Sequence, residues 1–175
     1  FLTNIPALFL AGTNFLELHL WDFGGVAGLD YKATVSYTPN VPFAAFTPKV
    51  EIESGTSFEV KAPFTLGSGN NGIAPLTEIV QLELTGGTGS FSTTIPAGSF
   101  KQDKKGRFKF EGTINNVALE AVIRPLGGNN FEFKAEGEGA TNLPTANPVT
   151  VKLTIGNDSG TATVTAEFDD DDDDD

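Results

Sequence analysis

Carboxylates are the side chains of this sequence whose type and spacing come closest to doing chemistry. Glu51 and Glu53 are two residues apart, as are Glu136 and Glu138, so each pair shares one face if its segment is a strand. Glycosidases place two carboxylates several ångströms apart across the bond that they hydrolyse. Charged residues that alternate along the solvent face of a strand are far more common. We therefore interpret both pairs as surface residues.

The remaining catalytic residue types are scarce. The only histidine, His19, lies between Leu18 and Leu20 and shares a polar face with Glu17. No nucleophile and no orienting acid are spaced to work with it, which argues against a hydrolase. The absence of cysteine excludes zinc ribbons, iron–sulfur sites, c-type haem and disulfide scaffolds. The sequence predicts a protein that is not an enzyme and needs no cofactor.

Seven consecutive aspartates, Asp169 to Asp175, end the chain. Like charges at this density repel one another and favour a solvated tail. Calcium prefers carboxylate oxygens, so Asp169, Asp170 and Asp171 are candidate ligands. The run lacks the turn glycine and spaced ligands of an EF-hand loop, so any calcium binding is expected to be weak. A third interpretation is an artificial extension of the chain.

Charge and hydropathy limit the partners. The formal net charge is −12, and the terminal run supplies seven of the negative charges. A mildly acidic body argues against nucleic acid, whose phosphates require a basic face. No stretch of 18 apolar residues exists, so no membrane-spanning helix is expected. The one basic cluster, 101–107, is predicted to be a solvated hairpin turn. The alternative is a docking site for an acidic partner, including the aspartate tail of another copy.

The dominant hydrophobic period is two residues, which is the period of a half-buried strand. Apolar and polar residues alternate in five clear segments: Tyr31–Tyr37, Val80–Leu84, Phe108–Phe110, Phe131–Phe133 and Val151–Ile155. Glycine- and asparagine-rich turn signals separate these segments. No window has the period and caps of a helix. The sequence predicts an all-β fold, an antiparallel β-sandwich of the Ig-like or jelly-roll-like kind.

The predicted organisation has three parts. Residues 1–13 form an apolar arm, 14–168 form the sandwich and 169–175 form the acidic tail. An alternative divides the sandwich into subdomains 14–62 and 77–168, joined by the loop 63–76. Within the sandwich, the segment that begins at Val80 is similar in sequence to the segment that begins at Val151, an internal echo. This echo reflects either the similarity of any two hairpins or a pseudo-repeat in equivalent places.

The arm is rich in large apolar side chains, namely Phe1, Leu2, Ile5, Leu8, Phe9 and Leu10. Exposure of this much apolar surface costs about 25 cal/mol per Å². The arm is therefore expected to be buried, either as a first strand of its own core or in a neighbouring subunit. A strand added to the open edge of another copy makes a head-to-tail contact, and such contacts grow filaments. Pro6 removes one donor from such a ladder.

A series of segments carries a resemblance: Ile95–Lys101, Gly106–Asn115, Val117–Glu120, Phe131–Gly137 and Asn147–Gly156. Over residues 90–168, about half of the chain, the sequence resembles a β-rich module of large secreted bacterial proteins, where it often occurs in tandem. The resemblance implies an exported sandwich that serves as a building unit. It implies no activity, because none is attached to the module.

These observations predict an extracellular or cell-surface location. The chain begins at Phe1 and contains no methionine, and a removed signal peptide would explain that start. The predicted function is a structural subunit of an extracellular filament or surface assembly, a homo-polymer joined through the arm. The alternative is a monomeric adhesive or carbohydrate-binding module, in which Trp21, Tyr31 and Tyr37 would line a face for surface glycans.

Overall fold

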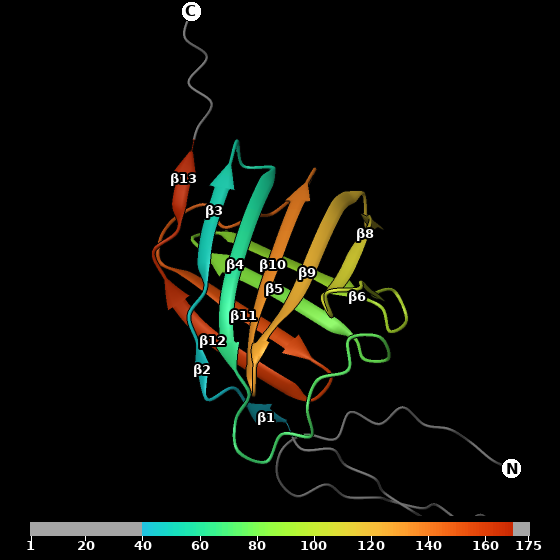
Figure 1. The fold of residues 1–175 in the computed structure, drawn as a ribbon. Helices are drawn as coiled ribbons and strands as arrows, with labels where there is room; N and C mark the ends of the chain where they lie inside the picture. Colours follow the sequence, from blue (N-terminus) through green and yellow to red (C-terminus); the bar gives the residue numbers. More distant parts are fainter. Residues whose placement is uncertain (1–39, 170–175) are drawn as a thin grey trace, which may run out of the picture. The chain divides into compact units, whose positions relative to one another are not determined.

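The computed structural model describes residues 40–169, which form two packed β-sheets (Figure 1). The five-stranded sheet has the order β1-β12-β11-β5-β6. Its strands are β1 (Val41–Pro42), β5 (Val80–Gly86), β6 (Gly89–Ile95), β11 (Val149–Ile155) and β12 (Asp158–Val164). No helix occurs in residues 40–169, so none there could cross a membrane. The predicted all-β sandwich is confirmed for this part of the chain.

The eight-stranded sheet has the order β13-β3-β4-β10-β9-β8-β7, with β2 paired to β4. Its strands are β2 (Ala45–Phe46), β3 (Lys49–Glu53), β4 (Ser57–Thr65), β7 (Lys101–Gln102), β8 (Phe108–Ile114), β9 (Val117–Gly127), β10 (Asn130–Glu138) and β13 (Glu167–Asp169). β4 pairs with β10 along its whole length, so segments far apart in the sequence share one ladder. β4 also continues to Thr65, into the segment predicted as a loop.

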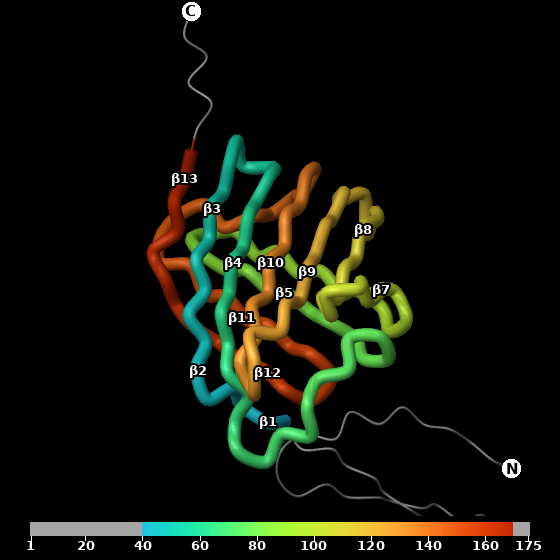
Figure 2. The backbone as a smooth tube through the Cα atoms, in the orientation of Figure 1, coloured from blue at the N-terminus to red at the C-terminus, as the bar shows by residue number. Residues whose placement is uncertain are grey.

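Alternating side chains from both sheets build one core. In β11, Val149, Val151, Leu153 and Ile155 point inward and are fully buried. In the facing sheet, Val60, Ile123 and Phe133 are at most 1% exposed. The strands of the two layers cross at an angle, as the tube in Figure 2 also shows. The period-two alternation predicted for Val80–Leu84 and Val151–Ile155 is confirmed, whereas Tyr31–Tyr37 lies outside the described residues.

The two echoing segments are neighbouring hairpins in the five-stranded sheet. β5–β6 and β11–β12 each consist of two strands of equal length joined by a two-residue turn. Sequence similarity aligns Val80 with Val151, whereas superposing the turns aligns Val80 with Val149, the first residue of β11. Glu83 then corresponds to Lys152, and these two residues are also paired across β5 and β11.

The hairpins are therefore related by an approximate two-fold axis through this pair. The two alignments differ by an even number of positions, so each side chain stays on the same face of the sheet in both.

Glycine at the first turn position explains the shape of both hairpins. Gly87 has φ +59° and Gly156 has φ +58°, the left-handed region that a side chain makes costly. A positive φ at the first position alone is the pattern of a type II′ turn, whose twist matches the strands. The β8–β9 turn instead has Asn115 and Asn116 both at positive φ, as a type I′ turn requires.

We predict that Gly137→Ala destabilises the protein by about 1–3 kcal/mol, the usual cost of overpacking a core. A Cβ atom at Gly137 would lie 2.3 Å from Cε1 of Phe58, which is 3% exposed and held in the core. Urea unfolding measures the free energy. In a Phe58→Leu background the same substitution should cost less, because the ring atoms are gone. An equal cost in both backgrounds would contradict this explanation.

Candidate functional site

The residues that the sequence singled out are divided between described and undescribed parts of the chain. The donor residues Phe1, Leu2, Ile5, Leu8, Phe9 and Leu10 lie outside the described residues, as do His19, Trp21, Tyr31, Tyr37, Asp170 and Asp171. Asp169 is described and ends β13, paired with Glu53. In residues 40–169, no group of three or more histidine, cysteine, aspartate or glutamate side chains is arranged to hold a metal ion.

The solvent face of the eight-stranded sheet carries a straight row of glutamates. The ladder registers place six of them directly opposite one another, strand by strand, in the order Glu167, Glu51, Glu59, Glu136, Glu120 and Glu111. Each is exposed or half-exposed, and the residues that flank it along its strand lie on the inward face of the sheet. At about 4.8 Å between strands, the row extends across about 24 Å. We call these six residues the glutamate row.

A second row runs beside the first, two residues away along each strand. It contains five lysines in register and one valine, in the order Lys49, Lys61, Lys134, Val122, Lys109 and Lys101. Two residues of a strand span about 6.7 Å, which separates the rows. We call these the lysine row. The face therefore carries a negative stripe and a positive stripe that both run across the strands.

The ion pairs that join the two rows are concentrated on one lysine. Lys134 lies within 3.3 Å of Glu59 and also contacts Glu136. The hydrogen bond to Glu136 raises the pKa of the Lys134 ammonium above its usual value, with a further contribution from Glu59. Within residues 40–169, Lys49 and Lys61 form no ion pair within 4.0 Å. In the described part of the chain, therefore, no direct contact with a carboxylate neutralises these two lysines on β3 and β4.

At the β13 end of the glutamate row the carboxylates are crowded. Partial burial raises the pKa of Glu51 above its usual value, and the negative charges of Asp169, Glu53, Glu167 and Glu59 raise it further. Like charges directly opposite one another on adjacent strands are destabilising. The fold therefore maintains this row at a cost in free energy at neutral pH.

The other outer face is different in kind. Hydroxyl side chains dominate the solvent side of the five-stranded sheet, namely Thr85, Ser90, Ser92, Thr94, Thr150, Thr154, Thr161 and Thr163. Thr150 and Thr163 are opposite each other, with 3.0 Å between their Oγ1 atoms. The one ion pair of this face within residues 40–169 joins Lys152 Nζ to Glu83 Oε1 at 2.9 Å. The sandwich thus has one striped, charged face and one mostly neutral, hydroxyl-bearing face.

The predicted basic turn is confirmed. Asp103 organises residues 103–107: its Oδ1 accepts hydrogen bonds from the backbone N–H groups of Lys105 and Arg107 at 2.8 and 3.0 Å. Its Oδ2 is 2.7 Å from the Arg107 guanidinium. Burial acts to raise the pKa of Asp103, but these hydrogen bonds outweigh it and lower the pKa. The turn is held by its own acidic residue.

Strand β8 leaves a sheet edge open beyond β7. β7 pairs only with Phe108 and Lys109. The backbone N–H of Asp103 donates to the carbonyl oxygen of Arg107, just before β8. Backbone groups of successive residues in a strand face opposite neighbours, so the odd-numbered residues of β8 direct theirs toward the β7 side, away from β9. In residues 40–169, Glu111 and Thr113 continue this pattern with no strand to receive them.

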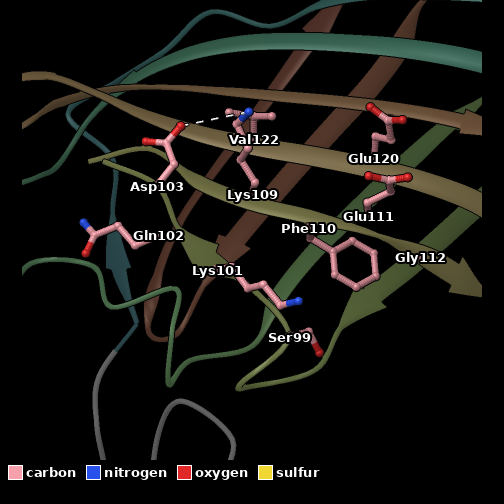
Figure 3. Close-up of a pocket in the computed structure, with 10 residues that line it drawn as sticks. All are labelled: Ser99, Lys101, Gln102, Asp103, Lys109, Phe110, Glu111, Gly112, Glu120 and Val122. Atoms are coloured by element: carbon pink, nitrogen blue, oxygen red, sulfur yellow. Dashed lines mark ion pairs between the residues drawn. The ribbon is translucent and has the colours of Figure 1, made fainter. Parts of the chain in front are cut away.

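An open groove of about 550 Å³ follows this edge. Its lining includes Ser99, Lys101, Phe110, Glu111 and Gly112 (Figure 3). The Phe110 ring packs against Phe100, with 6.0 Å between ring centroids. Figure 3 shows the ring beside Lys101, with Glu111 of β8 and Glu120 of β9 next to each other. The inward side chains Phe110 and Ile114 remain only half-buried.

Among the described residues, one carboxylate is buried without a partner. Asp158, the first residue of β12, has no exposed surface, and neither Oδ1 nor Oδ2 receives a hydrogen bond from residues 40–169. Burial raises the pKa of Asp158, and the charge of Glu78 raises it further. The adjacent Ser159 exchanges hydrogen bonds with Asn40 at 3.0 and 3.1 Å. The β1–β12 contact therefore encloses a group that favours its neutral form.

Sequence reasoning identified the pairs Glu51/Glu53 and Glu136/Glu138 as surface residues, and their exposure agrees with this. It missed the rows, because each row depends on the registers of non-adjacent strands. It also missed Asp158. The period-two pattern offered a signal there, since Asp158 falls on the buried face of its strand.

We predict that Glu51→Gln stabilises the protein at neutral pH. A raised pKa in the folded state means that folding favours the protonated form, so stability falls as pH rises above the usual glutamate range. The gain from Gln should therefore be larger at pH 7 than at pH 4, and smaller in 0.5 M salt. Thermal unfolding measures it. Glu132→Gln is the matched control: Glu132 pairs with Arg124 at 2.8 Å, so its loss should not stabilise. A gain from both substitutions would contradict local repulsion as the cause.

We predict that Asp158→Asn raises the free energy of unfolding by about 1–3 kcal/mol at pH 7, because a buried charge without a partner is removed. The raised pKa gives the sign: the penalty grows as pH rises through the folded-state pKa and disappears where Asp158 is protonated in both states. Asp103→Asn should show the opposite trend, because its lowered pKa contributes stability that is lost as pH falls. Denaturant unfolding between pH 3 and 7 measures both. An Asp158→Asn effect independent of pH would contradict this account.

Comparisons with protein-family models, with curated proteins and with solved structures found no match to this chain.

Proposed function

We propose that the protein is a structural subunit of an extracellular filament or surface assembly. In this proposal, the amino-terminal segment of one copy adds as a strand to β8 of the next. The observation that carries the proposal is the open edge of β8, where Glu111 and Thr113 direct backbone groups away from β9. Strand addition at such an edge satisfies backbone hydrogen bonds and buries side chains together.

The exposure of inward apolar side chains favours β8 as the acceptor over β6, the edge strand of the five-stranded sheet. The inward side chains of β6, Phe91, Thr93 and Ile95, are at most 6% exposed, so an added strand would cover little there. Phe110 and Ile114 of β8 are only half-buried. An apolar strand beside β8 would remove more apolar surface from water, and this burial drives association.

The composition of segment 1–10 supplies a suitable donor. Large apolar residues make up six of its ten positions, and a fully extended segment of this length spans about 33 Å. That reach exceeds the length of β8. The resemblance of residues 90–168 to a module of secreted bacterial proteins supports the extracellular setting and the role of a building unit. The alternative, an adhesive or carbohydrate-binding module, depends on Trp21, Tyr31 and Tyr37, which lie outside the described residues.

We predict that Thr113→Pro abolishes assembly, because proline removes the outward N–H that a donor strand would use. Ser92→Pro is the matched control, since it removes an outward N–H from the edge of β6. Light scattering and negative-stain microscopy on the full chain should show elongated particles for the wild type and Ser92→Pro, and no elongated particles for Thr113→Pro. Ile5→Asp with Leu8→Asp should also abolish the elongated particles.

A monomeric wild type would overturn the filament function. Filaments that survive Thr113→Pro would show that β8 is not the acceptor. Unfolding measurements should place both proline variants close to the wild type, because neither outward N–H takes part in a ladder of the described sheets.

A further inference from the structure

The two rows together make the charged face of the eight-stranded sheet complementary to itself under a two-fold rotation. The glutamate row and the lysine row are parallel and about 6.7 Å apart, and both cross β3, β4, β10, β9 and β8. Consider a two-fold axis in the plane of the face, parallel to the rows and midway between them. Rotation about this axis places the glutamate row of one copy over the lysine row of the other.

We propose that this face pairs with the same face of a second copy of the chain. On β3, Glu51 then lies opposite Lys49 of the partner subunit, and on β4 Glu59 lies opposite Lys61 of the partner subunit. The reverse contacts follow from the symmetry, as in any isologous interface. The interface is separate from β8 strand addition and does not depend on the amino-terminal segment.

Charge complementarity selects a second copy over other occupants. A polyanion on the lysine row would lie within about 7 Å of the glutamate row, which is inside the Debye length of about 10 Å at 0.1 M salt. The glutamate row would therefore repel it. In the same way, the lysine row would repel a polycation or a cationic surface that binds the glutamate row. A second copy satisfies both rows at once.

The charges within one copy also favour pairing with a second copy. Lys49 and Lys61 form no ion pair within residues 40–169, whereas Lys134 in the centre already contacts two glutamates. The crowded Glu51 carboxylate lies beside this unpaired part of the lysine row, on the same strand as Lys49. Twisted sheets that pack face to face are aligned within about 30°. Alignment is therefore expected to be best near the centre of the pairing and to fade toward the edge strands.

Charge exchange on β3 and β4 tests the proposal in the full chain. An acidic variant carries Lys49→Glu and Lys61→Glu, and a basic variant carries Glu51→Lys and Glu59→Lys. A row-exchanged variant carries all four substitutions and has the composition of the wild type. Sedimentation velocity at about 20 mM and 500 mM salt measures association, with Thr113→Pro added to every protein so that strand addition does not contribute.

The proposal expects dimers of the wild-type face at low salt and at least about tenfold weaker association at high salt. The acidic and the basic variant alone should each associate at least about tenfold more weakly, a loss of about 1.4 kcal/mol. An equimolar mixture of the two should restore dimers, and the row-exchanged variant should dimerise like the wild-type face. Far-UV circular dichroism confirms that each variant is folded.

Several results would overturn the pairing. One is a wild-type face that stays monomeric at low salt in the Thr113→Pro background. Another is association that the single-sign variants leave unchanged. A third is a mixture of the acidic and basic variants that fails to dimerise while both are folded. None of these results bears on strand addition at β8, because Thr113→Pro already removes it.

Discussion

The continuous ladder between β4 and β10 is the pairing on which the rest of the eight-stranded sheet depends. It joins the hairpin β3–β4 to the meander β8–β9–β10, although the two units are far apart in the sequence. One face of this ladder contributes Val60, Ala62, Phe133 and Ala135 to the core, each at most 1% exposed. A slip by one residue would move these side chains to solvent and the charged ones inward. Core burial therefore fixes the register.

The same register creates the charged rows as a consequence. Once Glu59 lies opposite Glu136, the neighbouring ladders bring Glu51 and Glu120 into line with them. Cross-strand energetics favour opposite charges in register, which would mix signs across the strands. The glutamate and lysine rows instead alternate in sign along each strand and keep one sign across strands. The arrangement is unfavourable within a subunit, and it makes the face complementary to itself.

The sequence predicted what is local and missed what is distant. Strand identity in Val80–Leu84 and Val151–Ile155 follows from alternation, and the turn around Asp103 follows from its composition. Both features depend on residues that are close together in the chain. The open edge at Glu111 and Thr113 depends on where β7 ends relative to β8, and the glutamate row depends on the registers of several ladders. Neither leaves a trace within a single segment.

The alignment of the two hairpins by sequence similarity differs from their structural alignment by two residues. Similarity alone aligned Val80 with Val151, whereas the turns at Gly87 and Gly156 align Val80 with Val149. The even shift preserved the pattern of apolar side chains, so similarity had no means to detect it. Turn geometry decides the alignment because a two-residue type II′ turn fixes which residues are opposite.

The serine- and threonine-rich face of the five-stranded sheet has a consequence for any assembly in which the striped faces meet. Pairing would bury most of the charge between the copies and leave hydroxyl groups on both outer surfaces. Such a double layer would present to its surroundings a surface much like that of a neutral polysaccharide, rich in hydrogen-bonding groups and poor in fixed charge. Its hydration would then depend little on the salinity of the medium, even though the contact that holds it together does.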